Sequence, residues 1–389
     1  MASKTSIASK VIRPMKPRDL NESHRTATSL ELLFDLVSVI AIAAAASGLH
    51  HAIAASHFAK GIVKFTAAFF GIWWAWMNYT WFASAYDNDD ILFRLLTMII
   101  MGGALTMAAG IDRFFESTEP TLIVIGYVIM RLAMVVLWLR AARSDVACRR
   151  TALWYAGGVA IAQMYWVTFL FSQSTLGTSF YIMLALGAIL ELIVPILAER
   201  NGHTSWHRHH IIERYGLLTI IVLGETLLSG SMALEQVSKS FNASLIYIAF
   251  SALTIVFSMW WLYFSSEEHL ETNKLSRALI WGYGHILIFA SGAAVGAGFG
   301  VLVDIVTEHS VVDLTTGNYA VAIPIALYLA GLWFVRDRFT LNGVAWYPLL
   351  IFAALILIAP LFSSIIGVAG LTALCVFVRS CMTQKKTTS

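Results

Sequence analysis

Three ionisable residues lie within one apolar stretch of this sequence, residues 212–228. Glu213 and Arg214 open the stretch, and Glu225 follows about 18 Å further along a helix axis. A charged group inside a membrane-spanning helix is costly, so it marks a functional site by default. The apolar residues around Glu225 favour a protonatable or cation-paired carboxyl, and the alternative is a buried structural hydrogen bond. Gly224 would let another helix approach closely beside it.

A second pair of carboxylates opens the first apolar run, which begins at Ser29. Glu31 and Asp35 are four residues apart, so on a helix they share one face, and Ser38 continues that face. We do not expect this face to meet lipid. Either the carboxylates line a transport path, or Glu31 lies at the interface near the positive helix N-terminus and Asp35 pairs with an arginine for packing.

Other polar residues within the apolar runs have both a functional and a structural interpretation. His285 is either a neutral imidazole bonded to a neighbouring helix or a partner for one of the carboxylates, Glu225 in particular. Arg131 and Glu191 are candidates for a buried ion pair between the fourth and sixth helices. After His285, glycines recur every four residues and predict close helix packing: Gly292, Gly296 and Gly300.

The turn after the second apolar run is acidic, and a helix is expected to begin near Ile91. Asp87 and Asp90 belong to this turn; its aspartates either cap that helix or attract a cation, with Arg94 as an alternative partner. The histidines of residues 199–210 have spacings that a metal site could use, but they lack the cysteine or carboxylate partners of a strong metal motif. We therefore expect no metal and no cofactor.

Composition defines the class of protein. Of the 389 residues, 58% are hydrophobic and 13% are charged, which is the balance of a polytopic membrane protein rather than a soluble domain. A net charge of +3, without a basic stripe, argues against nucleic-acid binding. The sequence has no P-loop, no G-x-S-x-G elbow and no H-E-x-x-H motif, so an enzyme is not expected. The three cysteines are too few and too poorly spaced for a disulfide framework.

The positions of the apolar runs predict an all-α, polytopic transmembrane helical bundle of about twelve spans. The last two runs are short and meet near Pro360, so eleven spans is the alternative. The expected spans are 29-50, 58-84, 91-112, 120-142, 151-172, 178-198, 211-233, 243-264, 276-303, 317-336, 344-360 and 361-379.

Basic residues predict how the chain is oriented in the membrane. With the N-terminus inside, 21 of the 26 Lys and Arg residues fall in cytoplasmic segments, so we expect both termini to be cytoplasmic. Residues 1–28 then form a basic cytoplasmic tail, in preference to a cleaved signal peptide, because the first apolar run is long and carries two acids. Residues 380–389 form a second cytoplasmic tail.

Matching residues in the two halves of the chain indicate an internal duplication. Because six is an even number of spans, the halves would be parallel repeats, 29–198 and 211–379, joined by the His-rich linker 199–210. The alternative is chance similarity among Trp-rich helices. The matches are Glu31 with Glu213, Trp73 and Trp74 with Trp260 and Trp261, Arg94 with Arg277, and Trp138, Arg140 and Arg143 with Trp333, Arg336 and Arg338.

Five stretches resemble the bacterial low temperature requirement protein A family: ELLFDLVSVIAIA from Glu31, YDNDDILFRLLT from Tyr86, HHIIERYGLLTIIVLGETLL from His209, MWWLYF from Met259 and YGHILIFASGAAVGAG from Tyr283. The first departs from the family pattern at Leu33 and Ser38, where aromatic residues are common. The resemblance implies a polytopic inner-membrane protein connected with growth in the cold, without assigning a substrate. It draws attention to Glu31, Asp35, Asp87, Asp90, Arg94, Glu213, Arg214, Glu225 and His285.

The leading functional hypothesis is a secondary transporter or channel for a small solute or ion, coupled to protons or a cation through the intramembrane carboxyls. In this hypothesis the carboxyls of the first and seventh helices line a path, and Glu225, with His285, is the protonatable centre. The second hypothesis is a non-transporting membrane sensor or scaffold involved in cold adaptation, and the third is a membrane-embedded enzyme. The expected partners are the lipid bilayer and the small solute or ion.

Overall fold

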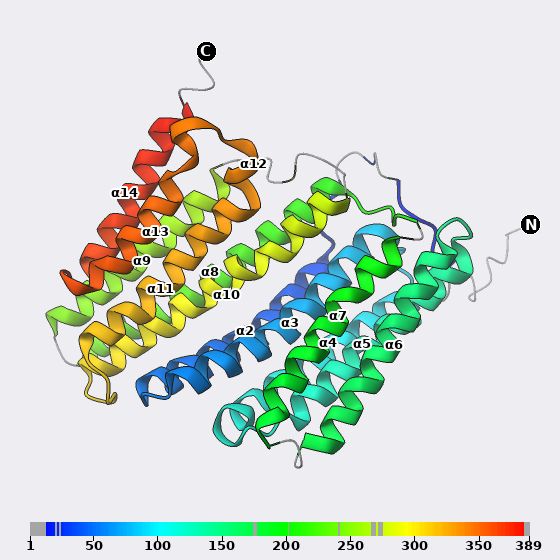
Figure 1. The fold of residues 1–389 in the computed structure, drawn as a ribbon, viewed down its shortest axis with the longest axis horizontal. Helices are drawn as coiled ribbons and strands as arrows, with labels where there is room; N and C mark the ends of the chain where they lie inside the picture. Colours follow the sequence, from blue (N-terminus) through cyan, green and yellow to red (C-terminus); the bar gives the residue numbers. More distant parts are fainter. Residues whose placement is uncertain are drawn as a thin grey trace, which may run out of the picture. The chain divides into compact units, whose positions relative to one another are not determined.

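In the computed structural model, the described residues form helices joined by short loops, and none of them forms a strand (Figure 1). The all-α fold class expected from the sequence is therefore confirmed. The structure describes residues 13–19, 22, 25–173, 177–200, 202–239, 242–265, 270 and 275–384.

Each of the twelve apolar runs contains one long helix. Apolar residues surround most of these helices on every side, as expected for helices enclosed by protein and lipid. The long helices are α2 (Ser29–Ala54), α3 (Phe58–Tyr86), α4 (Ile91–Ser117), α5 (Thr121–Ser144), α6 (Arg149–Ser172), α7 (Phe180–Glu199), α8 (Arg208–Lys239), α9 (Ala243–Phe264), α10 (Leu275–Val306), α11 (Leu314–Leu332), α13 (Pro348–Ile358) and α14 (Ile365–Gln384).

Within the described residues, nine helices are long and apolar enough to cross a membrane: α2, α4, α5, α7, α8, α9, α10, α11 and α14. Helices α3 and α6 have the necessary length, but their tryptophans, tyrosines and basic residues lower their hydropathy. The apolar segment Pro348–Leu361, which contains α13, is short for a complete crossing at 1.5 Å per residue. The fold is that of a multi-pass helical membrane protein.

Short irregular segments connect or extend several of these helices. Helix α11 continues into a π-helical turn, η3 (Trp333–Asp337), and then into α12 (Arg338–Thr340). The remaining short segments are 3-10 turns: η2 (Gly177–Ser179), η4 (Gly343–Trp346) and η5 (Ala359–Leu361).

The chain divides into two compact units, and the first comprises Met1–Ala41 and Ala67–Arg214. Here α4, α5, α6 and α7 pack in chain order, each against the next. Glycine allows the first of these contacts to be close, because a Cβ added at Gly103 of α4 would lie 2.6 Å from Cγ of Met130 on α5. Short loops between these helices make neighbours antiparallel.

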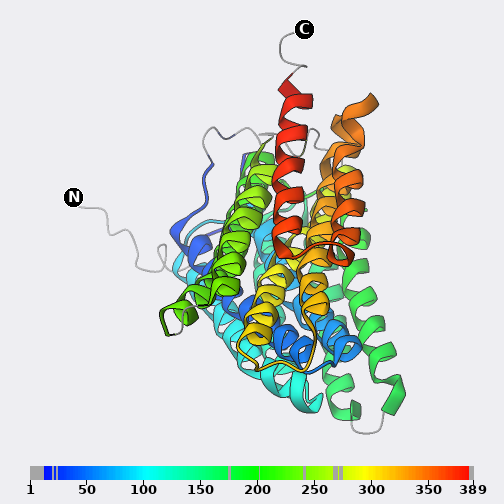
Figure 2. The same cartoon turned by 90° about the vertical axis from the view of Figure 1, so that its left-hand side faces the viewer.

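The second unit comprises Ile42–Thr66 and Tyr215–Ser389. Within it α10 packs against α11, α11 against α13, α13 against α14, and α14 against α9. Figure 2 shows α13 and α14 side by side near the C-terminus.

The glycine ridge of α10 lies in this second unit. A Cβ added at Gly292 would lie 3.0 Å from Cγ1 of Val222 on α8, and one added at Gly300 would lie 2.8 Å from Nδ1 of His50 on α2. Gly296, between them, is buried. The absence of side chains thus lets α8 and the end of α2 approach α10 closely.

The boundaries of the compact units cut through α2, α3 and α8, so the units do not coincide with the expected repeats 29–198 and 211–379. The units reflect spatial contacts, whereas the repeats follow chain order. Within each repeat, however, the third to sixth long helices pack in the same succession: α4, α5, α6 and α7 in one, and α10, α11, α13 and α14 in the other.

Candidate functional site

The first turn of α2 is held by a capping box formed by Thr28 and Glu31. The Glu31 Oε2 atom accepts hydrogen bonds from the backbone N–H of Thr28 at 2.8 Å and from its hydroxyl at 3.0 Å. In return, the Thr28 hydroxyl oxygen accepts from the N–H of Glu31 at 3.3 Å. Two otherwise unsatisfied donors of the helix start are thereby bonded, and the carboxylate lies near the positive end of the helix.

The first two turns of α8 supply the partners of Glu31 and Asp35. The Nε2 atom of His210 lies 3.1 Å from Oε1 of Glu31, and Nη2 of Arg214 lies 2.5 Å from Oδ1 of Asp35. Nη1 of Arg214 is 4.0 Å from Oε1 of Glu31. Glu31 and Asp35 are four residues apart on α2, as His210 and Arg214 are on α8, so each pair lies on one face of its helix. The two faces meet with His210 opposite Glu31 and Arg214 opposite Asp35. We call these four residues the charge cluster.

The charge cluster is almost completely buried. The side chains of Asp35, His210 and Arg214 are 0% exposed and that of Glu31 is 1% exposed. The indole N–H of Trp76 on α3 donates to the same Oδ1 atom of Asp35 at 2.7 Å.

Several polar atoms of the charge cluster nevertheless have no hydrogen-bond partner among the described residues: Oδ2 of Asp35, Nδ1 of His210, and Nε and Nη1 of Arg214. Buried polar atoms are normally bonded, so unused capacity at charged groups is costly. The cluster therefore has free donors and acceptors that could bind water, a proton or a polar ligand.

A stretch of the N-terminal segment packs beside the charge cluster. The N–H of Arg18 donates to the carbonyl of Ala85 at 3.0 Å, and the Arg25 guanidinium donates to the carbonyl of Ala83 at 3.0 Å. The ring Nε2 of His207 lies 3.0 Å from the carbonyl oxygen of Glu22. Part of the expected cytoplasmic tail, 1–28, is thus attached to the ends of α3 and α8, while residues 1–12 lie outside the described residues.

Asp87 follows α3 directly and is buried, being 5% exposed. Its Oδ1 atom accepts from the N–H of Asp89 at 2.9 Å. Burial raises the pKa of Asp87 to about 6, the negative charge of Glu31 adds to the increase, and the nearby charge of Arg25 opposes it. Asp87 can therefore change its protonation state near neutral pH, next to the charge cluster.

Replacing Asp87 with asparagine is expected to increase the free energy of unfolding at pH 7.5 by roughly 1–3 kcal/mol. The pKa of Asp87 is higher in the folded protein than in the unfolded chain, so ionisation of this carboxyl lowers the free energy of unfolding above about pH 6. This loss of stability disappears as the pH falls from about 6 to the ordinary pKa of an aspartate, because the carboxyl is then protonated in both states. The gain from Asp87→Asn should therefore shrink between pH 7.5 and pH 4.5. Thermal unfolding in detergent across this range tests it, with exposed Asp112→Asn as the control; a gain independent of pH would contradict it.

The neighbouring acids of this turn have separate partners. Asp90 caps α4, because its Oδ1 atom accepts from the N–H of Phe93 at 2.7 Å, and its Oδ2 atom lies 2.5 Å from Nη2 of Arg140. Arg94 pairs with Asp89 at 2.6 Å on the protein surface. The pKa of Asp90 is held below its ordinary value by hydrogen bonds from the backbone N–H groups of Arg13 and Phe93 and by Arg140, which together outweigh its burial.

The structure separates Glu213 from the charge cluster that its neighbour Arg214 joins. The Glu213 carboxylate accepts from the N–H of Ala27 at 3.2 and 3.3 Å. Its position opposite the first turn of α2 helps to hold the chain that enters that helix.

Glu225 is half-buried in the middle of α8, and among the described residues none forms a hydrogen bond or ion pair with it. The expected close approach of a helix beside Gly224 is wrong, because no heavy atom lies within 4 Å of a Cβ added there. Thr226, two residues further along α8, does contact another helix, because its hydroxyl donates to the carbonyl of Gly292 on α10 at 2.9 Å. Gly224 lies on a different face of α8.

His285 has no contact with Glu225, so the expected pairing of these two residues is wrong. The Nδ1 atom of His285 lies 2.7 Å from the carbonyl oxygen of Trp281, and its Nε2 atom lies 3.2 Å from the hydroxyl of Tyr263 on α9. Both ring nitrogens are thus occupied in a buried, aromatic environment. This is the structural interpretation, in which the imidazole is bonded to a neighbouring helix.

Arg131 of α5 and Glu191 of α7 form a buried ion pair, with 2.7 Å between Nη2 and Oε2. Glu191 accepts three further hydrogen bonds, from the side-chain N–H groups of Trp74 at 3.1 Å, Gln163 at 3.0 Å and Trp166 at 3.3 Å. One carboxylate thus joins α3, α5, α6 and α7. Such complete use of its lone pairs indicates a role in holding the first unit together.

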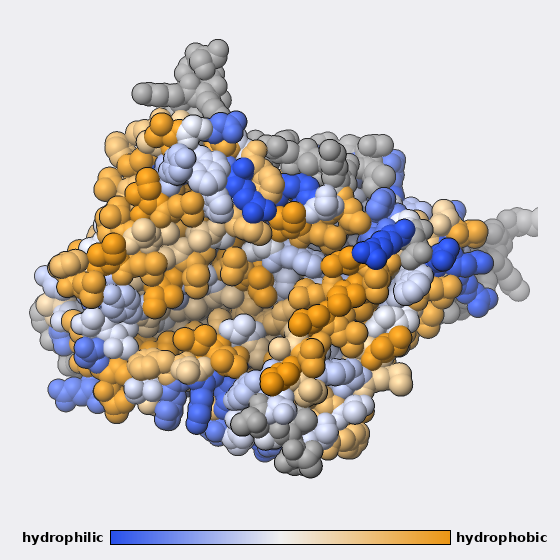
Figure 3. Space-filling view, viewed as in Figure 1, coloured by the Kyte–Doolittle hydropathy of each residue, from blue (hydrophilic) through white to orange (hydrophobic). Residues whose placement is uncertain are grey.

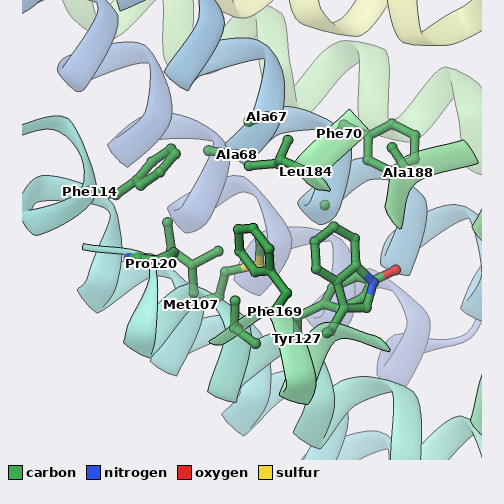
Figure 4. A pocket seen from close by; sticks show the side chains of 14 residues that line it. Ala67, Ala68, Phe70, Met107, Phe114, Pro120, Tyr127, Phe169, Leu184 and Ala188 are labelled. Atoms are coloured by element: carbon green, nitrogen blue, oxygen red, sulfur yellow. The ribbon is translucent and has the colours of Figure 1, made fainter. Parts of the chain in front are cut away.

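A small apolar cavity of about 60 Å³ lies among the same helices (Figure 4). Its lining is almost entirely hydrocarbon, which does not suit an ion. Each helix from α3 to α7 contributes to the lining: Phe70, Phe114, Tyr127, Phe169 and Leu184 are examples.

The second unit contains a buried charge network that the sequence analysis did not identify. Nε of Arg336 and Nη2 of Arg379 lie 2.7 and 2.8 Å from Oδ1 of Asp337, and Arg336 also donates to the carbonyls of Leu262 and Tyr263. A useful signal was Asp337 itself, an acid placed between two arginines at the end of an apolar run. The network joins α9, η3 and α14.

The histidines of the His-rich loop point to different partners. His203 lies 3.5 Å from a Glu199 oxygen, His207 contacts the carbonyl of Glu22, and His210 belongs to the charge cluster. Across the described ranges, no group of three His, Cys, Asp or Glu side chains could hold a metal ion.

Comparison with known proteins relates most of the chain to one family. The family model for the bacterial low temperature requirement A protein (LtrA) matches residues 26–381. The chain is also 28% identical over 341 residues to the uncharacterized protein RA0937 of Rhizobium meliloti (strain 1021), covering 82% of this chain and 79% of that protein. No solved structure matches the chain.

Proposed function

The chain belongs to the bacterial low temperature requirement A protein family, and we propose that it is a secondary transporter or channel of the inner membrane for a small solute or ion. The proposal includes coupling to protons or a cation through carboxyls inside the membrane. It assigns no catalytic residue.

The observation that carries the proposal is the charge cluster of Glu31, Asp35, His210 and Arg214. Four ionisable side chains are buried between the first helices of the two expected repeats, and several of their polar atoms have no partner in the part of the chain that the structure describes. Well-packed apolar residues would stabilise a membrane bundle at least as well as such a group. Ionisable residues inside membrane segments mark ion and proton pathways, which is why transport is preferred.

The proposed topology has twelve spans in two parallel six-helix repeats, with both termini in the cytoplasm. It is supported by the twelve long helices, by the shared packing order of the third to sixth helices in each repeat, and by the distribution of basic residues. In this topology α3, α6 and α13, which are less apolar or shorter, also cross the membrane.

Glu225 is proposed as a second carboxyl of the pathway. It lies well inside α8, is half-buried and has no cation partner among the described residues. A carboxyl placed in this way exchanges a proton or a cation more readily than one fixed in an ion pair. Its role does not depend on His285, whose ring nitrogens are occupied by Trp281 and Tyr263.

Replacing Glu225 with glutamine is expected to reduce flux at least tenfold while the protein remains folded, because glutamine keeps the shape and removes the charge and the titrating proton. The measurement is ion and proton flux in liposomes containing the purified protein, under imposed potassium, sodium and pH gradients. The matched control is Glu116→Gln, at an exposed position near the end of α4, which should retain full flux.

Two outcomes would count against the proposal. Full flux by the Glu225→Gln variant at every pH would exclude coupling through this carboxyl. The absence of flux by the unaltered protein under every gradient would remove the ion-transport proposal and favour a membrane sensor or scaffold. The fully bonded carboxylate of Glu191 is the observation that suits this second function, since its contacts serve packing.

A further inference from the structure

A groove of about 450 Å³ lies between α6 and α7 in the first unit. Its walls are aliphatic and aromatic, and several of these side chains are about half exposed, so they face the surroundings of the protein. Apolar residues cover the faces of α6 and α7 that are visible in Figure 3. The groove is lined by Arg150, Leu153, Trp154, Gly157, Gly158 and Ile161 of α6 and by Leu190, Ile193, Val194 and Leu197 of α7.

Two adjacent glycines of α6, Gly157 and Gly158, determine the shape of the groove. A Cβ added at Gly158 would lie 2.8 Å from Cγ1 of Val194, so this glycine allows α6 and α7 to pack closely. A Cβ added at Gly157 would meet no heavy atom within 4 Å. Gly157 therefore leaves space open beside the helix contact, and a larger side chain there would fill the groove without displacing α7.

The groove has the length of one lipid leaflet. From Arg150 to Ile161 the axis of α6 rises by about 16 Å at 1.5 Å per residue, and half the hydrocarbon thickness of a bilayer is about 15 Å. The apolar lining therefore extends from one membrane interface to about the bilayer centre. This depth matches an acyl chain better than it matches a compact apolar molecule.

A cation lies at the interfacial end of the groove. Arg150, in the first turn of α6, is exposed, and no acidic side chain among the described residues pairs with it. The end of α7 lies close by, because the Thr151 hydroxyl donates to the carbonyl of Gly202 at 3.0 Å. Arg200, which directly follows α7, is also exposed. An apolar groove that ends at an exposed cation suits a ligand with an apolar chain and an anionic head group.

We propose that the groove between α6 and α7 binds one acyl chain of an anionic glycerophospholipid, with the lipid phosphate at Arg150. The acyl chain lies along Leu153, Gly157 and Ile161, and the phosphate accepts hydrogen bonds from the guanidinium, which is a suitable donor for phosphate oxygens. This site is separate from the charge cluster, and the proposal does not depend on transport.

The test is lipid retention by the full-length purified protein. The protein is exchanged into mixed micelles with equal amounts of phosphatidylglycerol and phosphatidylcholine of the same chain length, and bound lipid is counted by native mass spectrometry. The unaltered protein should retain phosphatidylglycerol at least fivefold over phosphatidylcholine. Arg150→Gln should abolish this preference, and Gly157→Leu should reduce the retention of both lipids.

Matched controls separate the groove from general effects. Arg143→Gln removes another exposed arginine from the same end of the bundle, and Gly102→Leu fills an exposed glycine position of α4 that also has no atom within 4 Å of an added Cβ. Both controls should behave as the unaltered protein does. Arg150 is exposed, so its variant keeps the test valid even if Gly157→Leu fails to fold.

Three results would overturn the proposal. The first is equal retention of the two lipids by the unaltered protein. The second is an Arg150→Gln variant that keeps the preference for phosphatidylglycerol. The third is a folded Gly157→Leu variant that retains both lipids as well as the unaltered protein does, which would show that no acyl chain occupies the groove. Displacement by millimolar inorganic phosphate to the same extent in this variant and in the unaltered protein would likewise assign the binding to the cation alone.

Discussion

Replacing Arg214 with methionine is expected to lower the free energy of unfolding by roughly 3–5 kcal/mol, because removing one partner of a buried ion pair leaves the other charge without compensation. The guanidinium lies 2.5 Å from Asp35 and 4.0 Å from Glu31, and all three side chains are almost fully buried. Without it, Asp35 would keep the hydrogen bond from Trp76 but would have no cation beside it. The measurement is unfolding of the purified protein in detergent, followed by tryptophan fluorescence.

The double variant Arg214→Met with Asp35→Asn should recover most of this loss, since it removes both charges of the closest pair. The control is Arg113→Met, at an exposed position of α4, for which we expect a change below about 0.5 kcal/mol. A loss smaller than about 1 kcal/mol for Arg214→Met alone would show that Asp35 is not held as an ion in the folded protein.

Replacing Glu191 with leucine is the second substitution with a large expected effect, also a loss of roughly 3–5 kcal/mol. Leucine fills similar volume but accepts no hydrogen bond, so Arg131 loses its counter-ion and Gln163, Trp74 and Trp166 lose an acceptor. Each of these donors is buried and would be left unsatisfied. The same unfolding measurement applies, and Glu191→Gln, which keeps one acceptor oxygen, should lose less.

Combining Glu191→Leu with Arg131→Met tests whether the ion pair dominates this loss. If it does, the double variant should be more stable than Glu191→Leu alone, because no uncompensated charge remains. The exposed variant Glu119→Leu is the control. A double variant less stable than either single variant would show that the hydrogen bonds to the aromatic and amide side chains matter more than the charge of Arg131.

Local features of the sequence were sufficient to place the helices. Long apolar segments have no other way to satisfy their backbone groups in lipid, so each of the twelve expected runs contains a helix. The capping role of Asp90 is also local, because it depends on residues within the next turn. Membrane crossing by α13 does not follow from the pattern in the same way, since Pro348–Leu361 is shorter than the roughly 17 residues that a complete crossing needs.

Contacts between helices far apart in the chain could not be predicted from the pattern. Glu213 and Arg214 are adjacent, yet only Arg214 reaches Asp35, because the side chains of successive helical residues point about 100° apart. The sequence also did not indicate that Trp76 and His210 are partners of Asp35 and Glu31, since neither residue is unusual at its position in its helix. Charge and hydropathy identify residues that need partners without indicating which partners they have.

The glycines show the same difference between a local sequence pattern and a contact between helices. Gly224 and Gly292 both lie within apolar helices and have similar apolar neighbours in sequence, but only Gly292 lies against another helix. The recurrence of glycine every four residues carried the useful signal, because it keeps one face of α10 free of side chains. A single glycine, such as Gly224, does not produce a helix face that is free of side chains.

The π turn at Trp333–Asp337 lies in the segment that matches Trp138 and Arg140 in the sequence. A π turn holds one more residue than an α-helical turn, so it absorbs an insertion without changing the helix on either side. Trp138 and Arg140 are two positions apart, whereas Trp333 and Arg336 are three apart. The second arginine, Arg143 or Arg338, lies five positions after the tryptophan in both segments, so the difference in spacing is confined to the π turn. Arg336 pairs with Asp337, whereas Arg140 pairs with Asp90, so the two matched arginines hold different parts of the chain together.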